Sequence, residues 1–132
     1  MPEDTRRDDP GIPNTDRLFR RVPSHQLISE PGNMPRPSSA VFKNPELSVN
    51  IESLMTGQAR APEDTLTGYN GQFLCSITAG QVREFGHSVV KDTEPPNDPA
   101  HGLVLGKKSG SFANAMVRAC QWIVAPPTDS QG

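Results

Sequence analysis

The last third of the chain constrains its fold most strongly. Residues 102–127, GLVLGKKSGSFANAMVRACQWIVAPP, begin with an apolar run, pass through a basic Gly/Ser loop, and continue into a periodic segment and a second apolar run. Apolar residues recur in the periodic segment at the spacing of one helix face, namely at Phe112, Ala115, Met116 and Ala119. This order predicts a strand, a helix and a closing strand, and therefore a sheet with at least one helix packed on it.

Side-chain chemistry predicts where two helices begin. Ser111 is expected to cap the helix of the last third, which would end near Cys120. A shorter helix would follow the strand 73–77, because Thr78 and Gln81 have the spacing of a capping box. Gly86 would end that helix in a left-handed conformation, and the chain would then return as a strand over 87–92.

The first half predicts further strands. Residues 47–51, LSVNI, alternate apolar and polar positions, as a half-buried strand does. Residues 17–22, RLFRRV, would place Leu18 and Arg20 on one face and Arg21 on the other. Because neither face is cleanly apolar, we expect an edge strand. The sequence therefore predicts a single small α+β domain. Its sheet would be mixed but mainly antiparallel, cupped or half-barrel in shape, with two or three short helices.

Composition sets the expected boundaries of this domain. The chain has 132 residues, of which 33% are hydrophobic, with fourteen prolines and eleven glycines. Residues 1–16 and 128–132 contain almost no large apolar side chain and cannot offset the entropy of ordering their backbone. We therefore expect two disordered tails around a domain over 17–127.

The two cysteines and the absence of long apolar runs indicate a compartment. The first twenty residues are charged and do not resemble a signal peptide. No apolar stretch approaches the roughly 20 residues needed to span a bilayer. We expect a cytoplasmic protein without membrane contact, in which Cys75 and Cys120 are buried, reduced thiols. A disulfide between them is the alternative.

Charge argues against one class of partner and suggests another. The formal net charge is −2, whereas a protein that coats nucleic acid is strongly basic. The basic residues are nevertheless clustered, and with neighbouring hydroxyl groups they form a predicted basic rim for an acidic partner or a phosphate group. Ordinary solvated surface charge is the alternative. The rim comprises Arg20, Arg21, Arg36, Lys107, Lys108, Ser109 and Ser111.

The loop 106–111, GKKSGS, is the main anion-binding candidate. Free backbone N–H groups and two ammonium groups would lie at a helix N-terminus, where the helix dipole favours an anion. The loop is not a P-loop, because three residues rather than four separate Gly102 from Gly106 and Lys107 is followed by Lys108. A basic turn without a ligand is the alternative.

His101 is the main candidate for proton transfer. It lies at the mouth of a predicted strand after a proline-rich loop, and Asp98 would orient its ring. Lys107 and Lys108 lie at the far end of the same strand, about 20 Å away, which argues against one site that uses both. A structural histidine is the alternative. No spacing of histidine and cysteine typical of a metal site is present, and we expect no cofactor.

Two resemblances follow from short motifs. An arginine on the first strand, Arg20 or Arg21, and a later serine, Ser38 or Ser39, are similar to the Arg and Ser motifs of ADP-ribosyltransferase and RES-type toxin domains. This resemblance implies a split mixed sheet that grips a nicotinamide dinucleotide, although the family's catalytic acid has no clear counterpart here. The runs RPSSAVFKNPELSVNIESL and NDPAHGLVLGKK resemble a group of small bacterial proteins to which we attach no activity. That resemblance implies a bacterial, cytoplasmic setting.

Three functional hypotheses follow. The first is a non-catalytic binding or adaptor domain of a bacterial multi-protein system, which contacts another protein or a phosphate-bearing ligand through the basic rim. The second is a small toxin-like enzyme that acts on nucleotides or RNA, with His101 as general acid and base, Arg20 or Arg21 as anion stabiliser and Ser38 as a positioning hydroxyl. The third is a toxin-neutralising or defence component, whose acidic tail over 1–16 folds on a basic protein.

Overall fold

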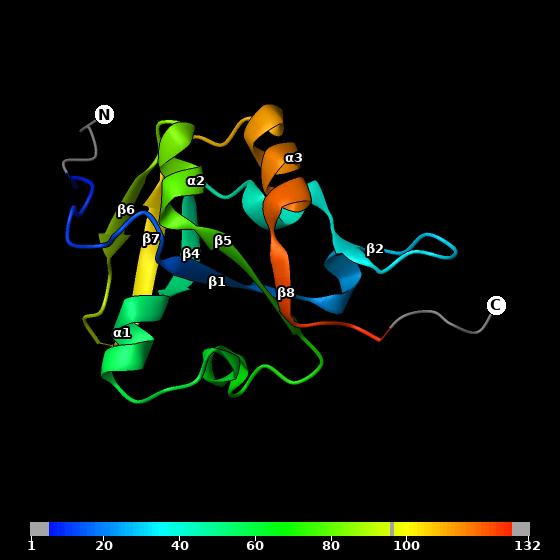
Figure 1. Ribbon diagram of the computed structural model, residues 1–132, viewed down its shortest axis with the longest axis horizontal. Coiled ribbons are helices and arrows are strands. Elements are labelled where there is room, and N and C mark those ends of the chain that lie inside the picture. Colours follow the sequence, from blue (N-terminus) through cyan, green and yellow to red (C-terminus); the bar gives the residue numbers. More distant parts are fainter. Residues whose placement is uncertain (1–5, 96, 128–132) are drawn as a thin grey trace.

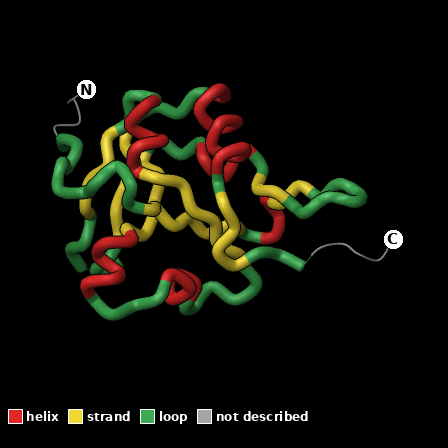
Figure 2. The backbone as a smooth tube through the Cα atoms, viewed as in Figure 1, coloured by secondary structure: helices red, strands yellow, loops and turns green. Residues whose placement is uncertain are grey.

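One six-stranded sheet forms the centre of the molecule. The computed structural model describes residues 6–95 and 97–127. The strand order is β6-β7-β4-β1-β5-β8, and the sheet is open. Every pairing in it is antiparallel. A two-stranded hairpin, β2-β3, projects from one end of the molecule (Figure 2). The prediction of a single small α+β domain with a mainly antiparallel sheet is confirmed.

The elements are short, as the many prolines and glycines lead one to expect. The strands are β1 (Arg17–Val22), β2 (Leu27–Ile28), β3 (Arg36–Pro37), β4 (Glu46–Ile51), β5 (Phe73–Thr78), β6 (Ser88–Lys91), β7 (His101–Leu105) and β8 (Gln121–Val124). The α-helices are α1 (Glu52–Gly57), α2 (Ala79–Glu84) and α3 (Gly110–Ala119). Three single 3-10 turns are η1 (Ser24–Gln26), η2 (Ser39–Phe42) and η3 (Pro62–Leu66).

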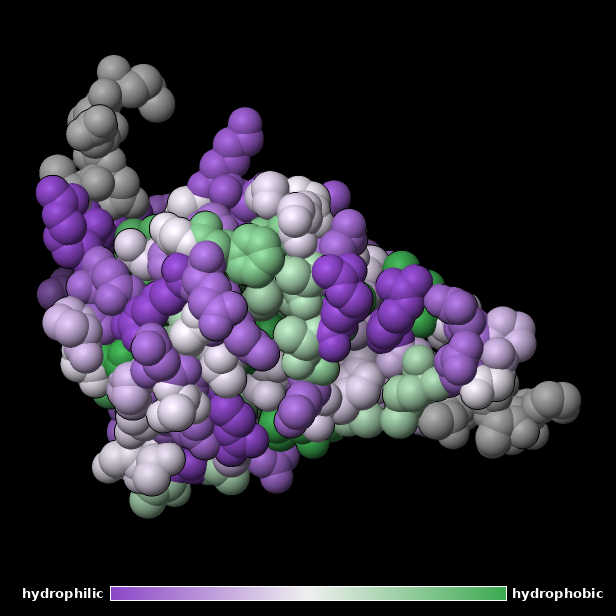
Figure 3. All heavy atoms as spheres, turned by 45° about the horizontal axis from the view of Figure 1, so that its top comes forward, coloured by the Kyte–Doolittle hydropathy of each residue, from purple (hydrophilic) through white to green (hydrophobic). Residues whose placement is uncertain are grey.

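Helices cover both faces of the sheet (Figure 1). The larger core lies under α2, α3 and η2, and includes Leu18, Val49 and Phe112. Figure 3, turned toward that side, shows a surface on which polar side chains alternate with small apolar areas. A smaller core lies on the opposite face, where Phe19 and Met55 pack beneath α1 and η3. The two cores follow from strand alternation, which sends successive side chains to opposite faces.

Strand β1 lies in the middle of the sheet, so the expectation of an edge strand is wrong. It pairs with β4 on one side and with β5 on the other. The predicted division of its side chains is confirmed, because Leu18 and Val22 join the larger core while Phe19 joins the smaller one. Each of its two central arginines finds hydrogen-bond acceptors on its own face, which is what allows a charged strand to be central.

The start of α2 is confirmed, whereas the cap of α3 lies two residues earlier than expected. At α2 the Thr78 hydroxyl accepts from the backbone N–H of Gln81, whose side chain accepts from Thr78 N–H. Gly86 follows with φ +84°. At α3 the cap is Ser109, whose side chain accepts from Phe112 N–H at 3.0 Å. Ser111, the expected cap, lies within the first turn.

Part of the N-terminal segment packs on the domain, although we expected residues 1–16 to be disordered. Ile12 is 1% exposed and belongs to the larger core. The guanidinium of Arg83 donates to the Asp8 carboxylate and to the carbonyls of Asp9 and Ile12. The buried side chain of Ile12 and the hydrogen bonds of Arg83 thus hold this mostly polar segment on the domain. Residues 1–5 and the expected tail over 128–132 lie outside the described residues.

The two thiols are free, and they interact. Cys75 is buried on β5, and Cys120 is half-buried just before β8. A hydrogen bond between them, together with burial, raises the pKa of the Cys75 thiol well above its ordinary value. A protonated, buried thiol is a poor nucleophile, so Cys75 is no candidate for covalent chemistry at neutral pH.

Candidate functional site

A pocket of about 650 Å³ opens on the α1 side of the sheet. Strands β1, β4 and β7 supply its floor, and the segment after α1 and the β6–β7 loop supply its walls. Its lining residues share one property, which is that every side chain is polar. They are Arg21, Ser48, Asn50, Arg60, Asp64, Thr65, Thr67, Tyr69, Asn97, Asp98 and His101.

The floor of the pocket follows directly from strand register. On β4, Leu47, Val49 and Ile51 point into the larger core, so Ser48 and Asn50 must point to the opposite face. Asn50 stands opposite His101 of β7 in the sheet. Arg21 has the same orientation on β1, which neighbours β4. Three adjacent strands therefore present polar side chains on one face of the sheet, with Arg21 two residues further along β1 than Phe19, which stands opposite Asn50.

Arg21 is the arginine of the pocket that has no carboxylate partner among the described residues. Its Nη1 donates to the Thr65 carbonyl at 3.2 Å, and its guanidinium carbon lies 3.9 Å from the centroid of the Tyr69 ring. Within residues 6–95 and 97–127 no carboxylate forms an ion pair with it. By contrast, five other arginines are each paired with an aspartate or glutamate: Arg6, Arg17, Arg36, Arg60 and Arg83.

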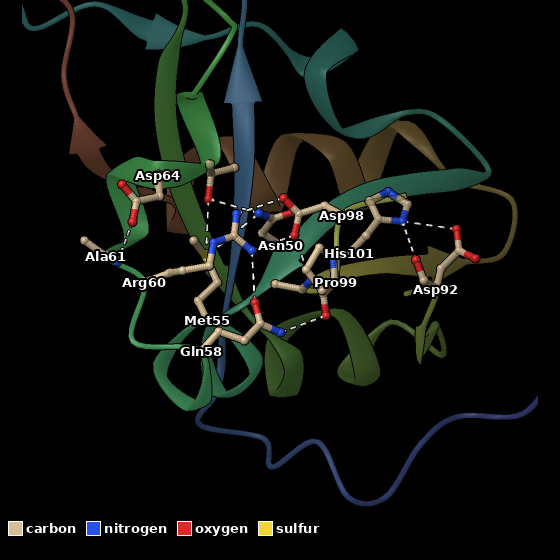
Figure 4. Close-up of polar contacts among 12 residues, drawn as sticks. Asn50, Met55, Gln58, Arg60, Ala61, Asp64, Asp92, Asp98, Pro99 and His101 are labelled. Carbon is tan, nitrogen blue, oxygen red and sulfur yellow. Dashed lines mark hydrogen bonds and ion pairs between the residues drawn. The ribbon is translucent and has the colours of Figure 1, made fainter. Parts of the chain in front are cut away.

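A bidentate ion pair joins two walls of the pocket (Figure 4). The Arg60 guanidinium donates to the two Asp98 oxygens at 2.7 and 2.8 Å. The side chain of Gln58 also donates to the Pro99 carbonyl at 3.0 Å. The hydrogen bonds from Arg60 hold the pKa of Asp98 below its ordinary value. Asp98 is therefore ionised at neutral pH and fixes the β6–β7 loop against the segment that follows α1.

His101 is oriented by Asp92 rather than by Asp98 (Figure 4). Its Nδ1 lies 3.1 Å from both the carboxylate and the backbone carbonyl of Asp92. Because both partners only accept hydrogen bonds, Nδ1 must carry a proton. Asn97 donates to the same Asp92 carboxylate at 2.9 Å. Asp98, which we expected to orient the ring, is occupied by Arg60 and by the Ala100 N–H.

A buried polar pair supports the middle of the pocket. Asn50 is 2% exposed and Thr65 is 3% exposed. The Asn50 amide donates to the Thr65 hydroxyl at 3.3 Å, and that hydroxyl contacts the Met55 sulfur at 3.4 Å. Buried polar side chains are stable where they are hydrogen-bonded. This pair links β4 to η3 and so positions the η3 wall of the pocket relative to the strands of its floor.

The predicted rim residues do not form one surface. Arg20 points to the face opposite Arg21 and donates to the carbonyls of Val41 and Ser48. Lys108 is only 8% exposed. Its ammonium is held by the carbonyls of Pro45 and Val104 at 3.2 and 2.9 Å, and by that of Gly106. Burial lowers the pKa of Lys108 to about 8. Both side chains are used inside the fold.

The remaining predicted residues lie elsewhere. Arg36 is exposed on the β2–β3 hairpin and pairs with Glu30. Lys107 and Ser111 are exposed at the start of α3, beside the capping residue Ser109. Ser38 precedes η2 and does not line the pocket. Of all the predicted site residues, the structure brings together Arg21 and His101.

Several pocket residues were missed by sequence reasoning. Arg60, Thr65 and Tyr69 lie on the irregular segment between α1 and β5, where no periodicity indicates direction. Ser48 and Asn50 could have been found, because they are the polar positions of an alternating strand whose other face is apolar.

Comparisons with known proteins give no further guidance. No family model, curated protein or solved structure gives a significant match to the chain. Across the described residues, no group of three or more His, Cys, Asp or Glu side chains is placed to hold a metal ion. In the same residues no helix has the length and apolar character to cross a membrane.

Proposed function

We propose that this chain is a binding domain whose ligand carries a phosphate or carboxylate group and enters the pocket beside Arg21. One observation carries the proposal: Arg21 lines the pocket and has no carboxylate partner among the described residues. A guanidinium that is held at one side by a carbonyl and an aromatic ring keeps its other donors for an anion.

Of the predicted basic rim, the proposal keeps only Arg21 as a ligand-binding residue. Arg20 and Lys108 already donate to backbone carbonyls, so an acidic ligand would have to compete with the fold for them. Arg21 makes one hydrogen bond to a carbonyl. An acidic group on a partner protein, as in an adaptor, would need to reach the same pocket. Such a partner remains a prediction.

Titration of the full chain with sodium phosphate and with sodium acetate, followed by amide chemical shifts, tests this function. We expect saturable shifts around Arg21 and Tyr69. Arg21→Ala should weaken phosphate binding about tenfold or more, because charge-assisted hydrogen bonds are lost. Arg118→Ala, which removes an exposed arginine of α3, is the matched control. Equal phosphate affinity in wild type and Arg21→Ala would refute the proposal.

A second candidate function is favoured by a different observation. His101 and Arg21 line one pocket, and Asp92 holds a proton on Nδ1 of His101. This leaves Nε2 for proton transfer, as an enzyme that acts on nucleotides or RNA would require. The hypothesis predicts that expression of the chain is toxic and that His101→Ala relieves the toxicity. His87→Ala, outside the pocket, is the control, and toxicity that persists in His101→Ala would exclude this role.

A further inference from the structure

The polarity of the side chains that line the pocket restricts the class of ligand further than their charge alone does. Most ligand pockets are predominantly apolar with a few polar groups, whereas every residue that lines this one is polar. The aromatic ring of Tyr69 already has the Arg21 guanidinium over it. A ligand that matches this lining must carry hydrogen-bonding groups along most of its length.

The charges in the pocket divide it into two parts. Arg21, beside Thr65 and Tyr69, forms a part without a paired carboxylate. Beyond it lie Arg60 and two carboxylates, Asp64 and Asp98. Asp98 is kept ionised by Arg60, and a carboxylate can only accept hydrogen bonds. A second anionic group on the ligand would be repelled there, so this part of the ligand must donate hydrogen bonds.

Neutral hydroxyl groups fit the second part better than cations. Arg60 neutralises Asp98, and its guanidinium would repel a cationic group that approached Asp64, the remaining carboxylate of this part. The Ser48 hydroxyl on the floor can donate and accept, as a sugar hydroxyl does, whereas the Asn50 amide already donates to Thr65. Arg21 and Asp98 come from different elements, β1 and the β6–β7 loop, and both line the pocket. Inorganic phosphate on Arg21 carries no further hydroxyl groups for the second part, whereas a phosphorylated sugar carries several.

We infer that the pocket binds a sugar phosphate, with the phosphate on Arg21 and the hydroxyl groups against Asp98 and Asp64. This inference rests on the proposed anion-binding function. The class includes the ribose phosphate part of a nucleotide. It excludes polyphosphates without a sugar and apolar acids.

Calorimetric titration of the full chain with four probes tests the inference. We expect ribose 5-phosphate to bind at least about tenfold more tightly than inorganic phosphate, and ribose to bind more weakly than ribose 5-phosphate. Gluconate, a carboxylate with a similar set of hydroxyl groups, should bind more weakly as well. Ribose 5-phosphate that binds no better than inorganic phosphate would overturn the inference and leave the proposed function standing. Gluconate that binds equally well would overturn the choice of phosphate.

Two variants locate the hydroxyl contacts. Asp98→Asn should abolish the advantage of ribose 5-phosphate, while the affinity for inorganic phosphate stays the same or rises because Arg60 is released. Asp64→Asn, at an exposed position, should reduce the same advantage without disturbing the Arg60–Asp98 pair. Glu63→Gln is the matched control, since Glu63 is exposed and outside the pocket. An unchanged advantage in both variants would overturn the inference. If no probe binds wild type, the proposed function falls as well.

Discussion

The guanidinium of Arg21 lies over the ring of Tyr69, with its carbon 3.9 Å from the ring centroid. The two residues are far apart in sequence, on β1 and on the loop before β5. Gly68 and Gly71, with φ of +84° and +79°, allow the loop to turn the ring toward the pocket. Such a contact contributes about 0.5–1 kcal/mol when exposed, and it also limits the directions in which the guanidinium can point.

Removal of the Tyr69 ring should therefore weaken anion binding through its effect on Arg21. We expect Tyr69→Leu to lower the affinity for phosphate several-fold, because Arg21 gains conformational freedom that binding must then remove. Tyr69→Phe keeps the ring and should bind like wild type. The measurement is the phosphate titration described above. A Tyr69→Phe variant as weak as Tyr69→Leu would instead assign the effect to the phenol hydroxyl.

The fold was largely predictable because local signals agree with one another. Thr78 and Gln81 form the capping box that their spacing indicates. The alternation of residues 47–51 gives the correct buried face of β4. The position of β1 could not be predicted, because the acceptors that satisfy Arg20 are backbone carbonyls of Val41 and Ser48. The position of a backbone acceptor cannot be predicted from residue types, because every residue has a carbonyl.

The start of α3 shows how a distant contact decides between two local signals. Ser109 and Ser111 are both suitable caps by residue type. Lys108 is held by carbonyls of Pro45, Val104 and Gly106, which fixes the turn just before Ser109. The helix therefore begins at Gly110, and Ser111 falls inside it.

The candidate site was predictable only in part. His101 and Arg21 were found because each follows or occupies a strand with a readable pattern. Arg60 and Tyr69 were not, since both lie on loops where only tertiary contacts fix direction. The partner of His101 was assigned to Asp98 by proximity in sequence, whereas the return of the chain along β6 brings Asp92 to the ring.

Arg20 and Arg21 should behave differently despite being neighbours. We expect Arg20→Leu to lower the free energy of unfolding by about 2 kcal/mol, because the partly buried carbonyls of Val41 and Ser48 lose their donor. Arg21→Leu should change stability little and affect ligand binding instead. Urea unfolding of both variants, with Arg118→Leu as an exposed control, measures the difference. Equal stability of the Arg20 and Arg21 variants would contradict the assigned roles.

The N-terminal segment should contribute to stability through Ile12. Ile12 is 1% exposed within the larger core, and truncation of a buried isoleucine to alanine costs about 2–4 kcal/mol. Ile12→Ala should therefore lower the urea midpoint strongly, whereas Thr15→Ala, at an exposed position of the same segment, should not. A stability of Ile12→Ala equal to that of wild type would indicate that the segment is disordered, as its composition predicts.

Lys108 should give the protein an unusual pH dependence at alkaline pH. Burial lowers its pKa from 10.5 to about 8, so between these pH values the unfolded chain binds a proton that the folded chain does not. The free energy of unfolding then rises with pH across this window, and the change is complete above pH 10.5. The full shift corresponds to about 3 kcal/mol, an upper value, since three carbonyls also stabilise the charged form.

Other groups titrate in the same range, so the comparison must isolate Lys108. Urea unfolding at pH 7.5 and pH 10 should be measured for wild type, Lys108→Met and Lys107→Met. The stability of wild type relative to Lys108→Met should increase with pH, while that of wild type relative to Lys107→Met should stay constant, because Lys107 is exposed. A constant difference for Lys108→Met as well would mean that the carbonyls of Pro45, Val104 and Gly106 offset the whole effect of burial on the ammonium.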